Sequence, residues 1–156
     1  SINPFVRPNV SSIIRGVGEQ VYDSIVKPQM NDFMGSVFEE ICKQYLIHQA
    51  KQKKLSFVPA YIGKWWGNNP AIRAQDDIDL LALNKKKTEG IFCECKFTNK
   101  PMPMEEYEDL LLAAKAFPET MKKQLMFISK SGYVDSVKRR AEEEGALLLT
   151  IQDLFI

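Results

Sequence analysis

Several residue types and motifs that mark common protein classes are scarce or missing in this sequence of 156 residues. The single histidine, His48, and the absence of any C-x-x-C pair exclude a zinc site of the common Cys/His spacing. No apolar run approaches the roughly 20 residues that span a bilayer, and the first residues do not have the pattern of a secretory signal. Gly16 and Gly18 are not followed by the Gly-Lys-Ser/Thr of a phosphate loop, so no nucleotide site is visible.

Charge of one sign is not in excess either. Lys and Arg number 21 against 20 Asp and Glu, which gives a net charge of +1. Any affinity for nucleic acid must therefore come from local patches. The composition, 45% hydrophobic and 26% charged, indicates one globular domain with a short appendage. The three cysteines, Cys42, Cys93 and Cys95, are expected to be small buried apolar residues rather than a redox group, and they fit a reducing cytoplasm as the location.

Hydrophobic periodicity predicts helices at both ends of a set of strands. After an irregular stretch over residues 1–15, a short helix is expected at 19–26 and to end at Pro28. Asn31 and Asp32 offer an N-cap for a long helix that runs to about Gln52. Gly35 within this helix is expected to mark close packing. The helix carries a broad apolar stripe that we expect to be buried: Phe33, Met34, Val37, Phe38, Ile41, Cys42, Tyr45 and Leu46.

The remaining pattern alternates strands and helices. Residues 55–66 are expected to be extended, with Trp65 and Trp66 on opposite faces, one in the core and the other packed on the N-terminal segment or available for stacking. A turn is expected at 67–70. The later elements are strands near 75–83 and 90–97, a helix at 104–117, a strand at 124–129, a helix at 134–144 and a strand at 146–150. The first three strands should form a meander and the helical crossovers should give parallel pairs, so the predicted fold class is α/β, a mixed central sheet flanked by helices.

Charged residues occur on the two central strands, where they are costly. Because strand side chains alternate between faces, Glu94 and Lys96 are expected to point one way, and Cys93, Cys95 and Phe97 the other. On the preceding strand, Asp79 is expected to lie opposite Ile78 and Leu80. Burying a charge costs several kcal/mol unless it is paired or binds a metal. The convergence of Asp79, Glu94 and Lys96 therefore predicts either a chemical site or a buried ion-pair cluster with a structural role only.

The residue types suit hydrolysis of a phosphodiester. Asp79 and Glu94 could share Mg²⁺ or Mn²⁺, with the backbone carbonyl of Cys95 as a further oxygen ligand. Such a metal would polarise the phosphoryl group and lower the pKa of a bound water. Lys96 could hold or deprotonate that water or stabilise charge on the phosphate. Glu39, on the long helix, could tune this metal or help to hold a second one, whereas Glu40 is expected to be solvated.

These residues resemble a known catalytic signature. Asp79, fourteen intervening residues and then Glu94-Cys95-Lys96, after a helix that bears Phe38-Glu39, is similar to the PD-(D/E)xK nuclease superfamily. The resemblance covers roughly residues 30–130 and implies a restriction-endonuclease-like α-β-β-β-α-β core. It departs from the pattern in one place, because Ile78 rather than Pro precedes the Asp.

A second resemblance covers nearly the whole chain. It rests on five segments, 5–9, 34–42, 62–66, 78–82 and 94–97, which read FVRPN, MGSVFEEIC, IGKWW, IDLLA and ECKF. They resemble the C-terminal domain of prokaryotic AAA-type ATPases of the archaeal group. That resemblance implies that residues 1–29 lead in from an ATPase and winged-helix region, that 30–156 form the nuclease-like domain, and that ATP is used only by the ATPase part.

Two functions follow as expectations. One is a metal-dependent nuclease, with DNA and the ATPase module as partners, no membrane, and Glu39, Asp79, Glu94 and Lys96 as its catalytic residues. The other is a catalytically inactive nuclease-like module that binds nucleic acid or a protein. The presence of all three motif residues favours the nuclease, and the near-zero net charge favours the binding module.

Overall fold

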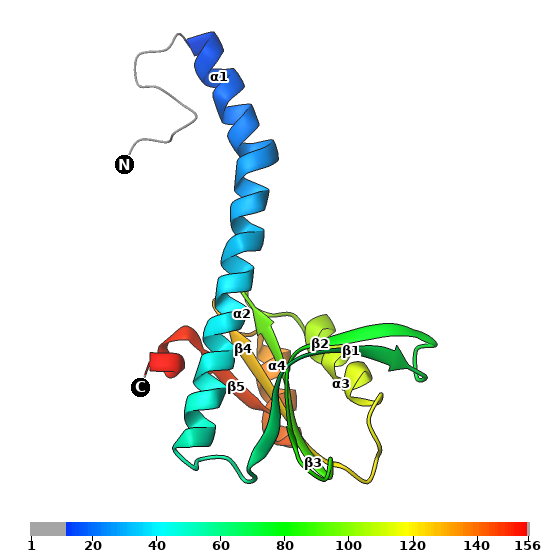
Figure 1. The fold of residues 1–156 in the computed structure, drawn as a ribbon. Coiled ribbons are helices and arrows are strands. Elements are labelled where there is room, and N and C mark those ends of the chain that lie inside the picture. Colours follow the sequence, from blue (N-terminus) through cyan, green and yellow to red (C-terminus); the bar gives the residue numbers. More distant parts are fainter. Residues whose placement is uncertain (1–11, 156) are drawn as a thin grey trace. The chain divides into compact units, whose positions relative to one another are not determined.

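The computed structural model describes residues 12–155 (Figure 1), and within this range the chain divides into two compact units on either side of the step from Val37 to Phe38. The first eleven residues, and with them most of the expected irregular stretch at 1–15, lie outside the described residues. The second unit contains the sheet and the candidate site.

The first unit is helical throughout its described part. Helix α1 (Ser12–Val21) continues through a π-helical turn, η1 (Tyr22–Val26), into α2 (Lys27–Lys51). The predicted helix end at Pro28 is wrong, because the chain stays helical on both sides of it. A proline lacks the N–H of the helical ladder and crowds the carbonyl four residues earlier. The wider π turn directly before it accommodates both defects.

The expected buried stripe of the long helix begins later than predicted. Phe33 and Met34 are 65% and 40% exposed, whereas Phe38, Cys42 and Leu46 are buried. No heavy atom of the described chain, outside the helix's own backbone, lies within 4 Å of a Cβ built at Gly35, so the expected close packing there is also wrong. Within the second unit, the part of the stripe from Phe38 onwards packs on sheet residues.

The second unit is built on one five-stranded sheet in the order β1-β2-β3-β4-β5. The first three strands pair antiparallel, and β3-β4 and β4-β5 pair parallel, which confirms the predicted meander and crossovers. The strands are β1 (Pro59–Asn69), β2 (Ala74–Asn84), β3 (Glu89–Lys96), β4 (Lys122–Ser129) and β5 (Leu147–Thr150). The other elements are α3 (Met104–Ala114), α4 (Asp135–Glu144) and a final 3₁₀ turn, η2 (Ile151–Phe155).

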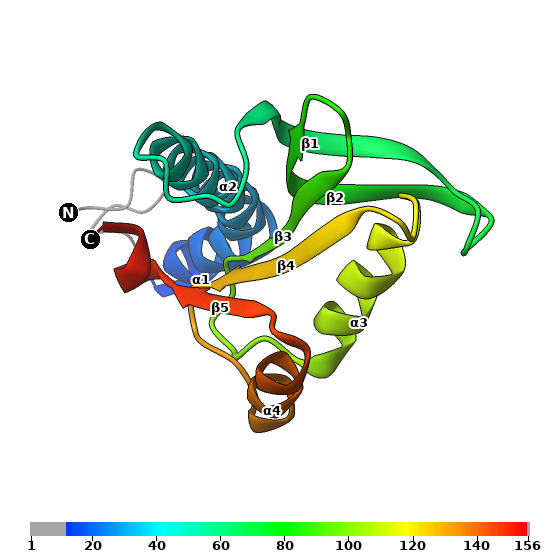
Figure 2. The same ribbon diagram turned by 90° about the horizontal axis from the view of Figure 1, so that it is seen from below.

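Helices cover both faces of this sheet, as predicted (Figure 2). On one face α3 and α4 pack through Tyr107, Leu110 and Val137 onto Ile78, Phe92 and other strand residues. On the opposite face the segment of α2 from Phe38 onwards packs through Phe38, Cys42 and Leu46. All three cysteines are free and buried in this second layer, which confirms their prediction as buried apolar residues. The alternation of β3 is also confirmed, since Cys93, Cys95 and Phe97 belong to this layer and Phe92 to the other.

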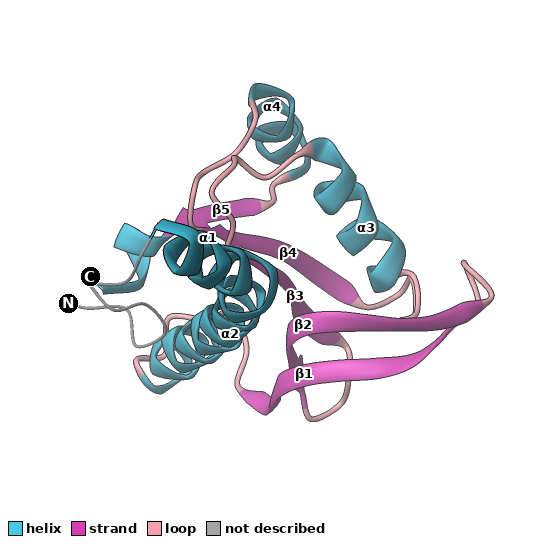
Figure 3. Cartoon of the chain, turned by 90° about the horizontal axis from the view of Figure 1, so that it is seen from above, coloured by secondary structure: helices cyan, strands magenta, loops and turns pink. Residues whose placement is uncertain are grey.

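The β1–β2 hairpin extends beyond the sequence prediction (Figure 3). Residues 67–69, expected to form a turn, continue β1, and the turn is made by residues 70–73 instead. The side chain of Asn69 explains the shift, because its Oδ1 accepts the Ala71 N–H at 3.1 Å and so begins the turn at Asn69.

A β-bulge interrupts β2 at the position of Asp79. Gly63 pairs with Leu81 and Trp65 with Ile78, so Asp79 and Leu80 together lie opposite the single residue Lys64. As a consequence, Ile78 packs against the α3 layer and Leu80 against the α2 layer. The prediction that both lie on one face is therefore wrong, because it assumed an unbroken strand, whereas a bulge adds one residue and reverses the alternation beyond it.

The described helices include none that is both long enough and apolar enough to cross a membrane.

Candidate active site

The candidate site lies where β2 separates from β3. The register of these strands ends with the pair Leu80 and Cys93. Beyond it, the side chain of Asp79 bridges the two strands, since its Oδ2 accepts the backbone N–H of Cys95 at 3.0 Å. In an extended strand the N–H and C=O of one residue point to the same neighbour. The carbonyl of Cys95 therefore faces β2 in the region where ladder pairing has ended, as a further oxygen ligand would require.

The bulge changes the direction of the Asp79 side chain. On a regular strand its side chain would stand on one face of the sheet, whereas here it lies between the two strands. The same carboxylate lines the cleft that contains Glu94 and raises the pKa of Glu39 on the opposite face of the sheet. Bulges commonly redirect one side chain beside a functional site in this way.

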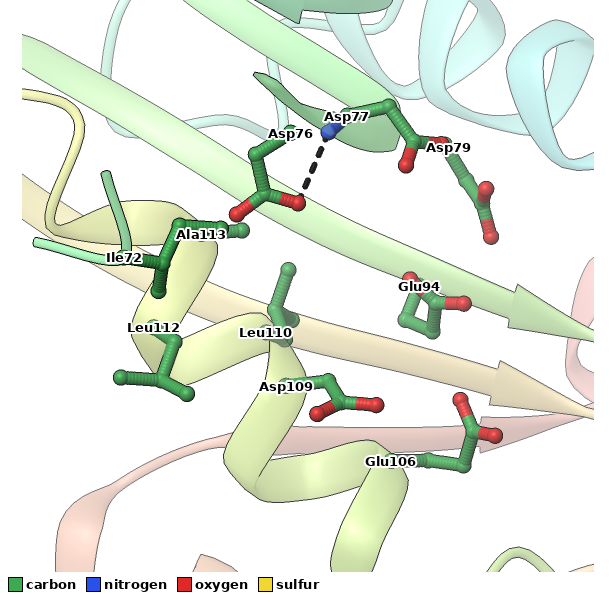
Figure 4. Close-up of a pocket in the computed structure, with 10 residues that line it drawn as sticks. All are labelled: Ile72, Asp76, Asp77, Asp79, Glu94, Glu106, Asp109, Leu110, Leu112 and Ala113. Atoms are coloured by element: carbon green, nitrogen blue, oxygen red, sulfur yellow. Dashed lines mark hydrogen bonds between the residues drawn. The ribbon is translucent and has the colours of Figure 1, made fainter. Parts of the chain in front are cut away.

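A cleft of about 230 Å³ joins Asp79 and Glu94 (Figure 4). Helix α3 forms its opposite wall, and Figure 4 shows Glu106 of that helix directed toward Glu94. Among the described residues that line the cleft, the charged ones are all carboxylates: Asp76, Asp77, Asp79, Glu94, Glu106 and Asp109. Such a concentration of negative charge favours a bound cation.

Glu94 is the most strongly perturbed carboxyl group that lines this cleft. Its burial, together with the negative charge of Asp79, raises its pKa to about 9, and Glu106 adds to the shift. In the metal-free chain Glu94 therefore carries a proton at neutral pH. A cation in the cleft would have to displace that proton.

Lys96 lies beside these carboxyl groups and forms an ion pair with α3. Its Nζ donates to Glu106 Oε1 at 2.8 Å, and both side chains are largely buried. Burial lowers the pKa of Lys96, but the hydrogen bond and charge of Glu106, with Glu94 and Asp79, outweigh it and raise the pKa above its ordinary value. Lys96 is therefore an ammonium group that can donate hydrogen bonds, which suits it to stabilise charge rather than to remove a proton from water.

Glu39 approaches the site from α2 and does not line the cleft. Its carboxylate lies 4.0 Å from Lys64 Nζ, which also lies 3.9 Å from Asp77. Burial and then the charge of Asp79 raise the pKa of Glu39, although Lys64 opposes them. Glu39 is thus placed to influence Asp79 electrostatically. Glu40 is exposed and accepts a hydrogen bond from Gln44, as its predicted solvation requires.

Asn69 is fully buried and bonds to residues that line the cleft. Its Nδ2 donates to Asp76 Oδ2 at 3.0 Å and to the Leu112 carbonyl at 2.8 Å. One amide thus fixes the hairpin against α3 and orients a carboxylate of the cleft. The sequence analysis missed Asn69 by assigning it to a turn.

We expect Asn69→Ala to destabilise the chain by about 1–3 kcal/mol, because it removes the two hydrogen bonds that the buried amide donates and the one that it accepts from Ala71. Urea denaturation would measure the change. The matched control is Asn68→Ala at the neighbouring exposed position, which should change stability by less than about 0.5 kcal/mol. Equal stabilities for the two variants would show that the Asn69 hydrogen bonds contribute nothing net.

The oxygen donors present suit a hard divalent cation. Within residues 12–155, no three acidic, histidine or cysteine side chains form a preassembled metal site. Mg²⁺ does not need one, because it commonly binds through one or two carboxylates and keeps several waters. Asp79, deprotonated Glu94 and the Cys95 carbonyl are the groups that would hold it, while Lys96 and Glu106 remain paired beside it.

Comparison with known proteins places the chain in a family. A family model for archaeal and bacterial proteins of unknown function, DUF234, matches residues 3–110. The chain belongs to this family. The DUF234 match includes α2, β1, β2 and β3, and therefore Glu39, Asp79, Glu94 and Lys96.

Two further similarities concern individual proteins. An uncharacterized protein, MJECL04, of Methanocaldococcus jannaschii is 33% identical over 93 residues, which are 60% of this chain and 19% of that protein. The chain thus spans about a fifth of the length of the curated relative that it matches. A crystal structure of a protein of unknown function, AF1548, is similar with a TM-score of 0.46 and 18% identity, over 68% of this chain and 55% of that one.

The structure brings three of the four predicted catalytic residues together, and it adds Glu106. Asp79 and Glu94 line one cleft and Lys96 lies beside them, while Glu39 is separate. Glu106, in the first turn of α3, was not among the predicted site residues. One signal was available: α3 follows β3 after a short loop, so its first turn must lie near the end of β3.

Proposed function

We propose that this chain is a metal-dependent nuclease domain that hydrolyses phosphodiesters in DNA. One observation carries the proposal. Asp79 leaves the regular strand at a bulge, bonds across to Cys95 and shares a carboxylate cleft with Glu94, while the charged Lys96 lies alongside. A bulge and a largely buried, protonated carboxyl group are irregular and costly features, and such features gathered at one cleft are typical of functional sites.

Each residue of the site has a separate role in the proposed hydrolysis. A divalent cation at Asp79 and Glu94 would supply the charge that polarises the phosphate and acidifies water. The hydrogen bond from the Cys95 N–H holds the Asp79 ligand in place relative to β3, and the Cys95 carbonyl is a ligand on β3 itself. Lys96 donates hydrogen bonds toward charge that develops on the phosphate, and Glu106 holds the ammonium in place. Glu39 adjusts the charge around Asp79 through Lys64.

The fold assignment and the wider protein belong to the same proposal. The α-β-β-β-α-β order of the second unit and the spacing of Asp79, Glu94 and Lys96 support a restriction-endonuclease-like fold of the PD-(D/E)xK type. The resemblance to C-terminal domains of AAA-type ATPases, together with the much greater length of the archaeal relative, supports an ATPase module as partner. ATP would then bind to that module.

The test is conversion of supercoiled plasmid to nicked or linear DNA with Mg²⁺ or Mn²⁺, and its loss in EDTA. Lys96→Gln should slow cleavage at least about tenfold, because the glutamine keeps a donor but loses the charge. Lys122→Gln is the control, since Lys122 is exposed and lies at the far end of β4, 3.7 Å from Glu89. Nicking by both variants at the wild-type rate would indicate a contaminating nuclease. DNA binding without cleavage would favour the inactive binding module instead.

A further inference from the structure

We infer that a second groove, on the β1–β2 hairpin, binds unpaired nucleotides of the DNA substrate. We call it the aromatic groove. Its volume is about 530 Å³, and its aromatic lining residues are Tyr61, Trp65, Trp66 and Phe117. The inference rests on the proposed nuclease function and adds the strandedness of the substrate to it.

The charge of the aromatic groove is opposite to that of the carboxylate cleft. Among the described residues that line the groove, the charged ones are all lysines: Lys64, Lys85 and Lys87. Lys85 and Lys87 are exposed, in the turn between β2 and β3. The net charge of the chain is only +1, so this local segregation creates a surface that attracts phosphate where the whole molecule does not.

The aromatic rings of the groove are held in place, which favours stacking. Trp65 packs against Phe117 with ring centroids 5.0 Å apart. The Tyr61 hydroxyl donates to the backbone carbonyl of Lys64, and its oxygen lies 2.9 Å from a Cβ built at Gly63. A side chain at position 63 would displace that ring. Tyr61 nevertheless remains 45% exposed, so a fixed aromatic surface meets solvent.

The groove is connected to the carboxylate cleft through Lys64. This residue lines the groove, and its Nζ lies 3.9 Å from Asp77, which lines the cleft. The same ammonium lies 5.7 Å from the centroid of the Trp66 ring. A single strand whose bases occupy the groove would therefore pass Lys64, which lies next to a residue of the cleft.

Unpaired nucleotides fit this lining better than a duplex does. A duplex presents phosphates outward and keeps its bases stacked inside, so it could use the lysines but not the aromatic floor. A single strand presents both, and every base has a face that can stack on an aromatic ring. The exposed rings of Tyr61 and Trp66 offer an apolar surface that suits a base and not a phosphate.

The experiment measures binding in EDTA, so that cleavage plays no part. The probe is fluorescein-labelled oligo(dT) of about 15 nucleotides, compared with a duplex of equal length by fluorescence anisotropy. We expect the wild type to bind oligo(dT) at least about tenfold more tightly than the duplex, and Tyr61→Ala to lose about tenfold for oligo(dT) alone. The double variant Lys85→Gln/Lys87→Gln should weaken oligo(dT) binding and reduce its salt dependence.

One control variant and one direct fluorescence measurement make the result specific. Lys86→Gln changes a lysine in the same exposed turn that does not line the groove, so it should bind like the wild type. In Trp66→Phe the remaining tryptophan is Trp65, whose fluorescence should be quenched when oligo(dT) binds. Circular dichroism and thermal unfolding confirm that each variant is folded.

The outcomes separate this inference from the proposed nuclease function. Unchanged oligo(dT) binding by Tyr61→Ala and by the double lysine variant would overturn the groove, whether or not the chain cleaves DNA. Equal affinity for duplex and single strand, or no binding of either, would overturn it as well. Groove-dependent binding with no metal-dependent cleavage would instead leave the groove established and refute the nuclease.

Discussion

Asp79→Ala is expected to reduce metal-dependent cleavage at least about 100-fold, because it removes the carboxylate that joins β2 to the site on β3. The alanine also leaves the Cys95 N–H without its acceptor, so part of any loss could come from local unfolding. Asp79→Asn separates the two effects. Its amide oxygen can still accept the Cys95 N–H, while the negative charge is gone. We therefore expect Asp79→Asn to fold as well as the wild type and still lose cleavage and Mn²⁺ affinity.

Cleavage rates, calorimetric titration with Mn²⁺ and urea denaturation on the same preparations would measure these effects. Asp135→Asn, in the first turn of α4, is the control for loss of one carboxylate outside the cleft. It should retain the wild-type rate. An Asp79→Asn variant that cleaves and binds Mn²⁺ like the wild type would falsify the assignment of Asp79 as a ligand, because it would show that only its hydrogen bond matters.

Glu94→Gln is expected to make the chain more stable at alkaline pH. In the unfolded chain this carboxyl group ionises near its ordinary pKa of 4.5, whereas in the folded chain its pKa is raised to about 9. Between those values the folded state holds one more proton, so the Glu94 contribution to stability is complete below the lower pKa and is lost as pH rises toward the upper one. At about pH 8 the variant should exceed the wild type by on the order of 1–3 kcal/mol, and at about pH 5 the two should nearly agree.

Urea denaturation at both pH values would measure this difference, with Glu108→Gln on the exposed side of α3 as control. Metal binding supplies an independent check. Since a bound cation requires the carboxylate form, binding should release close to one proton and strengthen as pH rises toward the raised pKa. Titrations in buffers of different ionisation enthalpy would count that proton. A wild type that binds Mn²⁺ without releasing it would contradict the role of Glu94 as a ligand.

The arrangement of strands and helices could be predicted from the sequence because it follows from local patterns. The strand predicted at 124–129 is found as part of β4, and Gly145 ends α4 with φ of 74° as a helix-stopping glycine should. Parallel pairing then followed from the helical crossovers. Likewise, Glu94 and Lys96 share a face because β3 is regular, so alternation alone was sufficient.

Other features depend on contacts that no local pattern encodes. The bulge at Asp79 is invisible in the sequence, because the apolar run at 80–83 fits either face of the sheet, and only pairing with Lys64 reveals the extra residue. Glu106 meets Lys96 because α3 packs over the end of β3, a tertiary contact. A proline ends most helices, but the π turn before Pro28 allows this helix to continue. At Asp79 and at Pro28 a single geometric irregularity overrode a correct general rule.

The bulge at Asp79 and Leu80 also affects how easily the site could be lost by mutation. Loss of one codon between Ile78 and Leu81 would restore uninterrupted pairing with β1 and keep every residue of the apolar layers beyond it. The same deletion would remove the carboxylate or turn it away from β3. A member of the DUF234 family could thus lose the proposed metal site in one mutational step and gain a more regular hairpin. The aromatic groove, built from Tyr61 and the turn lysines, would survive that step.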